Sequence, residues 1–156
     1  MKIGIIVYSQ TGNTLSAADR LKERFIKSGF DAVIEQIRQA DENNKDVNKI
    51  AIKNMPQLST YDILVFASPV QAFSLAAVFK AYLQNIERVD GKRVFCFVTK
   101  GIPKNGFGGN KSIKTITKIV SSKGGKAEKT AIIHWKDETV RNKQIDDMLE
   151  EFAAAI

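Results

Sequence analysis

Short apolar segments alternate along this chain with segments of helical periodicity. The first apolar segment, residues 3–8, reads Ile-Gly-Ile-Ile-Val-Tyr and has the length and β-branched content of a strand buried on both faces. Similar segments occur at residues 61–67, 92–99 and 127–133, and a more polar one at residues 32–37 suits the edge of a sheet. Strands that alternate with helices pair in parallel, because each helix carries the chain back along the sheet.

The segments between these strands have the spacing of amphipathic helices. Apolar side chains recur every three or four residues in four places: residues 14–28, 74–86, 113–120 and 145–152. Gly29 is expected to end the first helix, and Ser74 is expected to cap the start of the second. Residues 39–54 show neither pattern and predict a solvated loop or a weak helix. The chain therefore predicts one doubly wound α/β domain over residues 1–156.

Composition excludes several classes of protein. With 156 residues, 44% hydrophobic and 26% charged, the chain is of ordinary globular composition. Cys96 is the only cysteine and His134 the only histidine, so neither a disulfide nor a cysteine or histidine metal cluster is expected. No apolar run is long enough to cross a bilayer, and Met1-Lys2 leads directly into the first strand. We therefore expect a cytoplasmic protein without a membrane partner.

The loop after the first strand is the first candidate binding site. In doubly wound sheets, ligands bind beyond the carboxyl ends of the strands, where the strand order reverses. Helix-start amides carry a partial positive charge, Gly12 permits close backbone approach, and hydroxyl groups can donate to phosphate oxygens. The loop lacks the Gly-Lys-Ser/Thr of a P-loop and the three glycines of a dinucleotide fingerprint, which leaves a phosphate cradle or a plain capped turn. It consists of Ser9, Gln10, Thr11, Gly12, Asn13 and Thr14.

This loop resembles the Ser/Thr-x-Thr-Gly-Asn-Thr signature of flavodoxins, and the resemblance extends over essentially the whole chain. Other matching pieces are Tyr61-Asp62, Ser68-Pro69-Val70 and Phe107-Gly108-Gly109. The resemblance implies a flavodoxin-like five-stranded parallel sheet in the order 2-1-3-4-5, with helices on both faces. It also implies noncovalent FMN, with the phosphate in the first loop and the isoalloxazine ring between the loops after the third and fourth strands.

The same resemblance implies which residues hold the ring. The second loop comprises Ser68, Pro69, Val70, Gln71, Ala72 and Phe73. The third contributes Thr99, Lys100, Gly101, Lys104, Phe107, Gly108 and Gly109. Val70 and Lys104 stand where the family often has stacking aromatic residues, so Phe73 or Phe107 either replaces them or packs against a helix. The second loop contains no glycine and is expected to resist a positive φ.

Flavodoxins shuttle electrons between redox proteins, and this is the function that the resemblance implies for a monomer or weak dimer. Classical flavodoxins are acidic, whereas this chain carries a net charge of +7. The lysines at 111, 114, 118 and 123 form either a solvated helix face or a docking surface for an acidic redox partner. No zinc-finger or RNP-like motif predicts nucleic-acid binding, and no acid–base or nucleophilic constellation predicts catalytic side chains.

Two other functions stay open for this sequence. One is a flavodoxin-fold, FMN-dependent NAD(P)H:quinone-type reductase, which an open and weakly stacked ring pocket favours. The other is a binding protein that has kept the phosphate cradle and lost the flavin. His134-Trp135 at the end of the fifth strand is expected to lie too far from the reversal point to contact a cofactor, which makes Trp135 a lid or interface residue.

Overall fold

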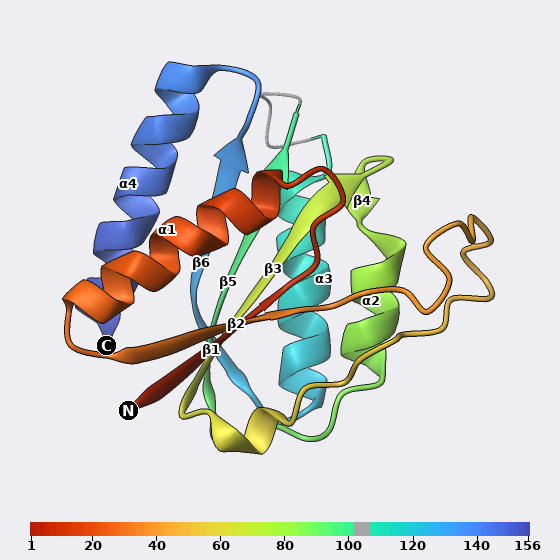
Figure 1. Cartoon of the computed structure of the whole chain (residues 1–156), viewed down its shortest axis with the longest axis horizontal. Coiled ribbons are helices and arrows are strands. Elements are labelled where there is room, and N and C mark those ends of the chain that lie inside the picture. The colour runs from red at the N-terminus through yellow and green to blue at the C-terminus, as the bar shows by residue number, and fades with distance from the viewer. Residues whose placement is uncertain (102–106) are drawn as a thin grey trace.

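The computed structural model describes residues 1–101 and 107–156 (Figure 1). Its parallel strands run in the order β2-β1-β3-β5-β6, which confirms the predicted order of the sheet. Their bounds are β1 Lys2–Val7, β2 Asp31–Gln36, β3 Ile63–Gln71, β5 Arg93–Lys100 and β6 Lys126–His134. A two-residue strand, β4 (Ser74–Leu75), pairs antiparallel with the end of β3.

Helices cover both faces of the sheet, with α1 and α4 on one face and α2 and α3 on the other (Figure 1). The helices are α1 Asn13–Lys27, α2 Ala77–Gln84, α3 Gly109–Ser122 and α4 Glu138–Ala155, and a 3-10 turn, η1, spans Leu58–Thr60. Side chains alternate between the faces along each strand. On β3, Leu64 and Phe66 pack toward α2 and α3, while Val65 packs toward α1 and α4. Because both faces are covered, the inner strands β1, β3 and β5 are largely apolar, as the sequence predicted. The edge strands β2 and β6 are more polar and carry exposed charged residues.

The register of the sheet brings the carboxyl ends of its strands to one edge. Pro69 of β3 lies opposite Thr99 of β5, and Lys100 lies opposite His134 of β6. Beyond β6, the Trp135 N–H donates to the Lys100 carbonyl at 2.8 Å. The loops that follow β1, β3, β5 and β6 are therefore neighbours, although they are far apart in the sequence.

The start of the second helix differs from the prediction. Ser74 does not cap it, because Ser74 and Leu75 pair as β4 with Gln71 and Val70 of β3. The helix begins instead at Ala77, and its N-cap, Ala76, has no side-chain hydrogen bond. Leu75 is buried in either arrangement, so its apolar character does not distinguish the first turn of a helix from a short strand.

The segment from residue 38 to residue 57 forms a loop beside the sheet, and no helix lies within it. An antiparallel bridge between Gln39 and Ile52 ties its two arms together.

None of the helices in the described part of the chain combines the length and hydropathy of a membrane-spanning helix.

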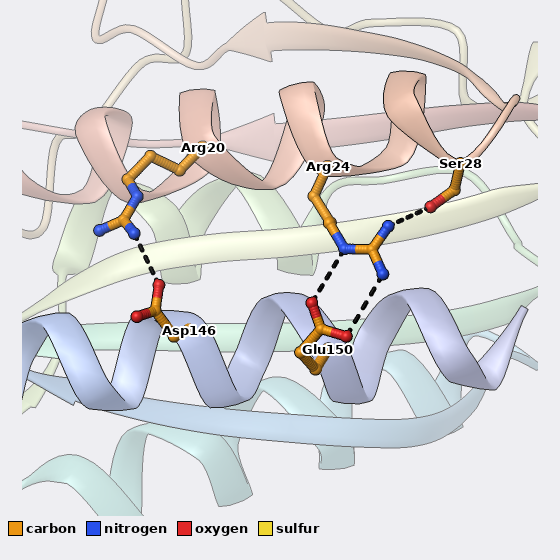
Figure 2. A network of polar contacts seen from close by, with 5 residues as sticks. All are labelled: Arg20, Arg24, Ser28, Asp146 and Glu150. Carbon is orange, nitrogen blue, oxygen red and sulfur yellow. Dashed lines mark hydrogen bonds and ion pairs between the residues drawn. The ribbon is translucent and has the colours of Figure 1, made fainter.

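Two ion pairs connect α1 with α4 (Figure 2). Arg20 Nη2 lies 2.7 Å from Asp146 Oδ1, and Arg24 Nε lies 3.1 Å from Glu150 Oε1. Arg24 also donates to the Ser28 hydroxyl. The two carboxylates are largely exposed and the two arginines partly exposed, so each pair contributes less than about 1 kcal/mol to stability. The pairs lie on the outer surface of the helices that cover this face of the sheet.

Candidate functional site

The loop before α1 holds an unusual backbone conformation. Gly12 has a φ of +92°, in the left-handed region, and a Cβ atom added to it would meet nothing within 4 Å. The Ser9 hydroxyl braces the loop by accepting hydrogen bonds from the amides of Gly12 (3.2 Å) and Leu15 (3.3 Å). The sequence predicted that the Ser9 hydroxyl donates to a phosphate. In the structure, the Ser9 oxygen accepts hydrogen bonds from the loop itself.

In the part of the chain that the structure describes, the first two amides of α1 have no acceptor. Within the described residues, the backbone N–H groups of Thr11, Asn13 and Thr14 make no hydrogen bond, and no acidic side chain lies in the first turn. Aligned unpaired amides at a helix start carry about half a positive charge and bind anions. The Thr14 hydroxyl is buried and lies 2.7 Å from the Thr99 hydroxyl, which links this helix start to the end of β5.

A cleft of about 180 Å³ opens at this edge of the sheet. Its lining residues come from the loop after β1 and from the ends of β3, β5 and β6: Gln10, Thr11, Asn13, Pro69, Val70, Gln71, Thr99, Lys100, Gly101 and Trp135. All of them except Trp135 belong to the predicted site. The expectation that Trp135 lies too far away is wrong, because the register of β6 carries the end of that strand level with Lys100.

Two further cavities, of about 250 and 230 Å³, lie beside the loop of residues 38–57. Both are lined by Tyr8, Gln10, Gln39 and Glu42. Gln71 lines the second cavity and the cleft, and its side-chain amide donates to the Gln10 side chain. Although these cavities are larger, we place the candidate site at the cleft, because Thr11 and Asn13, whose amides lack acceptors, line it.

The second loop has a conformation that the sequence did not predict. Ser68 to Gln71 belong to β3, and the chain then reverses through Ala72 (φ +47°) and Phe73 (φ +61°). Both residues therefore adopt a positive φ although neither is glycine and each resists that conformation. A two-residue connection between antiparallel strands favours left-handed conformations at both central positions, so the β3–β4 pairing holds them there.

The end of the third loop, at Gly108, lies close against this hairpin. A Cβ atom on Gly108, whose φ is +103°, would lie 2.6 Å from the Phe73 carbonyl carbon, so only glycine permits this approach. Phe73 and Phe107 are 58% and 44% exposed, and their ring centroids lie 6.1 Å apart. They therefore pack against each other at the surface, outside the lining of the cleft. Gly109 begins α3, and Lys104 lies outside the described residues.

Two basic side chains are buried at the ends of β5 and β6. Lys100 is only 4% exposed, and burial lowers its pKa from the usual value. Burial, and then the charge of Lys100, lower the pKa of His134, which keeps the imidazole neutral at pH 7. Gln144 of α4 orients His134, since its amide nitrogen lies 2.8 Å from Nδ1 and its oxygen accepts the His134 backbone N–H at 2.7 Å.

Cys96 is buried within β5, and burial raises the pKa of its thiol to about 12, so it stays protonated. Within residues 1–101 and 107–156, no group of three or more His, Cys, Asp or Glu side chains is placed to hold a metal ion.

Comparison with solved structures identifies the fold. A flavodoxin from Streptococcus pneumonia TIGR4 is 17% identical, with a TM-score of 0.68 over 100% of both chains. A flavodoxin from Fusobacterium nucleatum, solved bound to flavin mononucleotide, is 19% identical, with a TM-score of 0.67 over 99% of this chain and 98% of that one. Oxidised flavodoxin 2 from Bacillus cereus is 21% identical, with a TM-score of 0.67 over 100% of both chains.

No curated protein matches the chain. The model of a sequence family does match, over residues 1–122, and that family is described as NADPH-dependent FMN reductase. The matched segment contains the loop before α1, the β3–β4 hairpin and all of α3. The match confirms the predicted flavodoxin-like class and its FMN cofactor, and the chain belongs to the NADPH-dependent FMN reductase family.

Proposed function

We propose that this protein holds FMN at the cleft and transfers electrons between redox proteins. FMN, when bound, supplies the redox chemistry by accepting and releasing electrons at its isoalloxazine ring. The single observation that carries the proposal is the set of unpaired amides of Thr11, Asn13 and Thr14 at the start of α1, beside the cleft. The role of the protein is to bind the cofactor, orient it and leave it accessible to a partner.

The loop of residues 9–14 is proposed to bind the phosphate group. Its backbone amides would donate to the phosphate oxygens, and the partial charge at the helix start favours a dianion. Gly12 supplies the left-handed turn, and the Ser9 hydroxyl keeps the loop in shape before the ligand arrives. This preorganisation lowers the ordering cost of binding, since the loop need not rearrange.

The second and third loops are proposed to hold the isoalloxazine ring. Of the predicted residues, Pro69, Val70, Gln71, Thr99, Lys100 and Gly101 line the cleft. Enclosed sites for ligands of this size usually have volumes of about 300–1000 Å³. The described cleft has only about 180 Å³, so we expect one edge of the ring to stay exposed. An exposed edge suits electron transfer to a protein that docks there.

The charge distribution favours a partner with an acidic docking surface. The net charge is +7, and the exposed face of α3 carries Lys111, Lys114 and Lys118 with no acidic residue in that helix. Complementary charges accelerate the encounter of two proteins more than they tighten the complex. We therefore expect association rates that fall as salt is added.

The second candidate is an FMN-dependent reductase that takes a hydride directly from NADPH. The match of residues 1–122 to the NADPH-dependent FMN reductase family favours it. Steady oxidation of NADPH by purified holoprotein, with a quinone as acceptor, would select the reductase. A holoprotein that is inert toward NADPH but is reduced by a reductase partner would select the carrier.

Titration of FMN into the apoprotein tests both candidate functions, because each of them requires FMN binding. We expect the flavin fluorescence to be quenched and the visible spectrum of FMN to be perturbed at a stoichiometry of one. A protein that stays colourless and leaves FMN fluorescence unchanged would contradict both functions, and would select a binding protein without flavin.

A further inference from the structure

Trp135 lines the cleft beside the loop that begins α1, where Thr11 and Asn13 also contribute to the lining. Its backbone is held from two sides: its N–H donates to the Lys100 carbonyl, and its carbonyl accepts from Arg141 Nη1, each at 2.8 Å. The Arg141 guanidinium carbon also lies 4.9 Å from the centroid of the indole ring, within the range of a cation–π interaction. The side chain is therefore positioned by contacts with β5 and α4.

The position of Trp135 relative to the two faces of the sheet indicates which end of the cofactor it meets. Trp135 packs against the core cluster beneath α1 and α4. The β3–β4 hairpin, with Phe73, packs instead against the start of α3 on the other face. The anion-binding amides belong to α1, so Trp135 stands on the phosphate side of the cleft, away from the exposed pair of phenylalanines.

We propose that Trp135, positioned by Arg141, forms one side of the phosphate end of the flavin site. This arrangement makes the protein bind FMN in preference to riboflavin. The inference rests on the proposed function, since it needs a flavin in the cleft. The loop of residues 9–14 contains no lysine or arginine, whereas Arg141 holds a positive charge 4.9 Å from the centroid of the Trp135 ring, which lines the cleft with Thr11 and Asn13. That charge attracts a phosphate dianion and has no such effect on neutral riboflavin. With a phosphate in the loop, the indole would shield it from solvent and so strengthen the hydrogen bonds of the cradle.

The test compares the affinities of FMN and riboflavin in the full-length apoprotein, measured from the quenching of flavin fluorescence. Trp135→Leu should weaken FMN binding by about tenfold, the scale of losing one well-placed contact. It should leave riboflavin binding within about twofold. Arg141→Gln should reduce the FMN preference in the same direction, and Arg141→Lys should restore most of it. A purely structural role would weaken both flavins together, so the ratio of affinities is the decisive quantity.

Arg20→Gln is the matched control for Arg141→Gln. This variant also removes one positive charge from the face of the sheet that α1 and α4 cover. Arg20, however, pairs with Asp146 on the outer surface of these two helices, as Figure 2 shows. We expect the control to leave the ratio unchanged. Trp135→Phe keeps an aromatic ring in the core cluster and serves if the leucine variant does not fold.

The tryptophan itself provides a second measurement, because it is the only one in the chain. Inorganic phosphate added to the apoprotein should change the Trp135 emission saturably, while chloride at equal ionic strength should not. An unchanged ratio of FMN to riboflavin affinity in Trp135→Leu, or equal weakening of both flavins, would overturn the proposal. If the wild-type protein binds neither flavin, the proposed function fails as well, which separates that failure from failure at Trp135.

Discussion

Replacement of Gly12 by alanine tests the phosphate cradle directly. Gly12 has a φ of +92°, and an added Cβ atom would meet nothing within 4 Å, so the substitution introduces backbone strain without a clash. A non-glycine residue in the left-handed region costs about 1–2 kcal/mol. In the free protein the variant loop relaxes toward other conformations, which leaves the binding conformation populated in roughly one molecule in 5 to one in 30. Because the apparent dissociation constant rises as that fraction falls, FMN affinity should drop about 5- to 30-fold.

The chain contains a matched control at the other end of the same helix. Gly29 has a φ of +87°, and a Cβ atom there also meets nothing within 4 Å. Gly29→Ala should lower the free energy of unfolding by a similar 1 to 2 kcal/mol, roughly, and leave the dissociation constant of FMN unchanged. The assay is a fluorescence titration of each apoprotein with FMN, together with urea unfolding. Equal affinities of the two variants would refute the placement of the phosphate in the loop of residues 9–14.

Three further predictions concern stability. Thr14→Val leaves the Thr99 hydroxyl buried without its partner at 2.7 Å, so urea unfolding should show a loss of about 1–3 kcal/mol, and the double variant with Thr99→Val should lose less than the sum of the single losses. Gly108→Ala places a Cβ atom 2.6 Å from the backbone of the β3–β4 hairpin and should lower the melting temperature far more than Gly91→Ala, where φ is also positive but nothing lies within 4 Å. Burial, and then a hydrogen bond to a carboxylate, raise the pKa of Tyr61 from 10.0 to about 12. The folded state therefore disfavours ionisation, so stability should be fully present below pH 10 and fall as the pH rises toward 12. In Tyr61→Phe that part of the decline should be absent, and an identical pH profile would contradict the assignment.

Much of the fold can be predicted from local patterns. Apolar segments such as residues 3–8 indicated strands buried on both faces, and amphipathic spacing indicated the helices that cover them. The Ser9–Thr14 signature then indicated the order of the strands and the phosphate end of the site by resemblance. These signals depend on residues close together in the sequence. The structure confirms the strands, the helices and the strand order, and the phosphate end of the site stays a prediction.

The tertiary structure decided the features that depend on pairing over longer distances. Ser74 and Leu75 form β4 because the end of β3 offers them backbone partners, and this pairing holds Ala72 and Phe73 at positive φ against their own preference. Trp135 reaches the cleft because the register between β5 and β6 sets where β6 ends, and no local pattern encodes that register. The sequence by itself determined most of the strands and helices through hydrophobic periodicity, and it predicted a phosphate-binding loop from helix-start chemistry and the resemblance. Only the tertiary structure decided which side chains meet around that loop, because distant backbone groups satisfy their hydrogen bonds across the whole sheet.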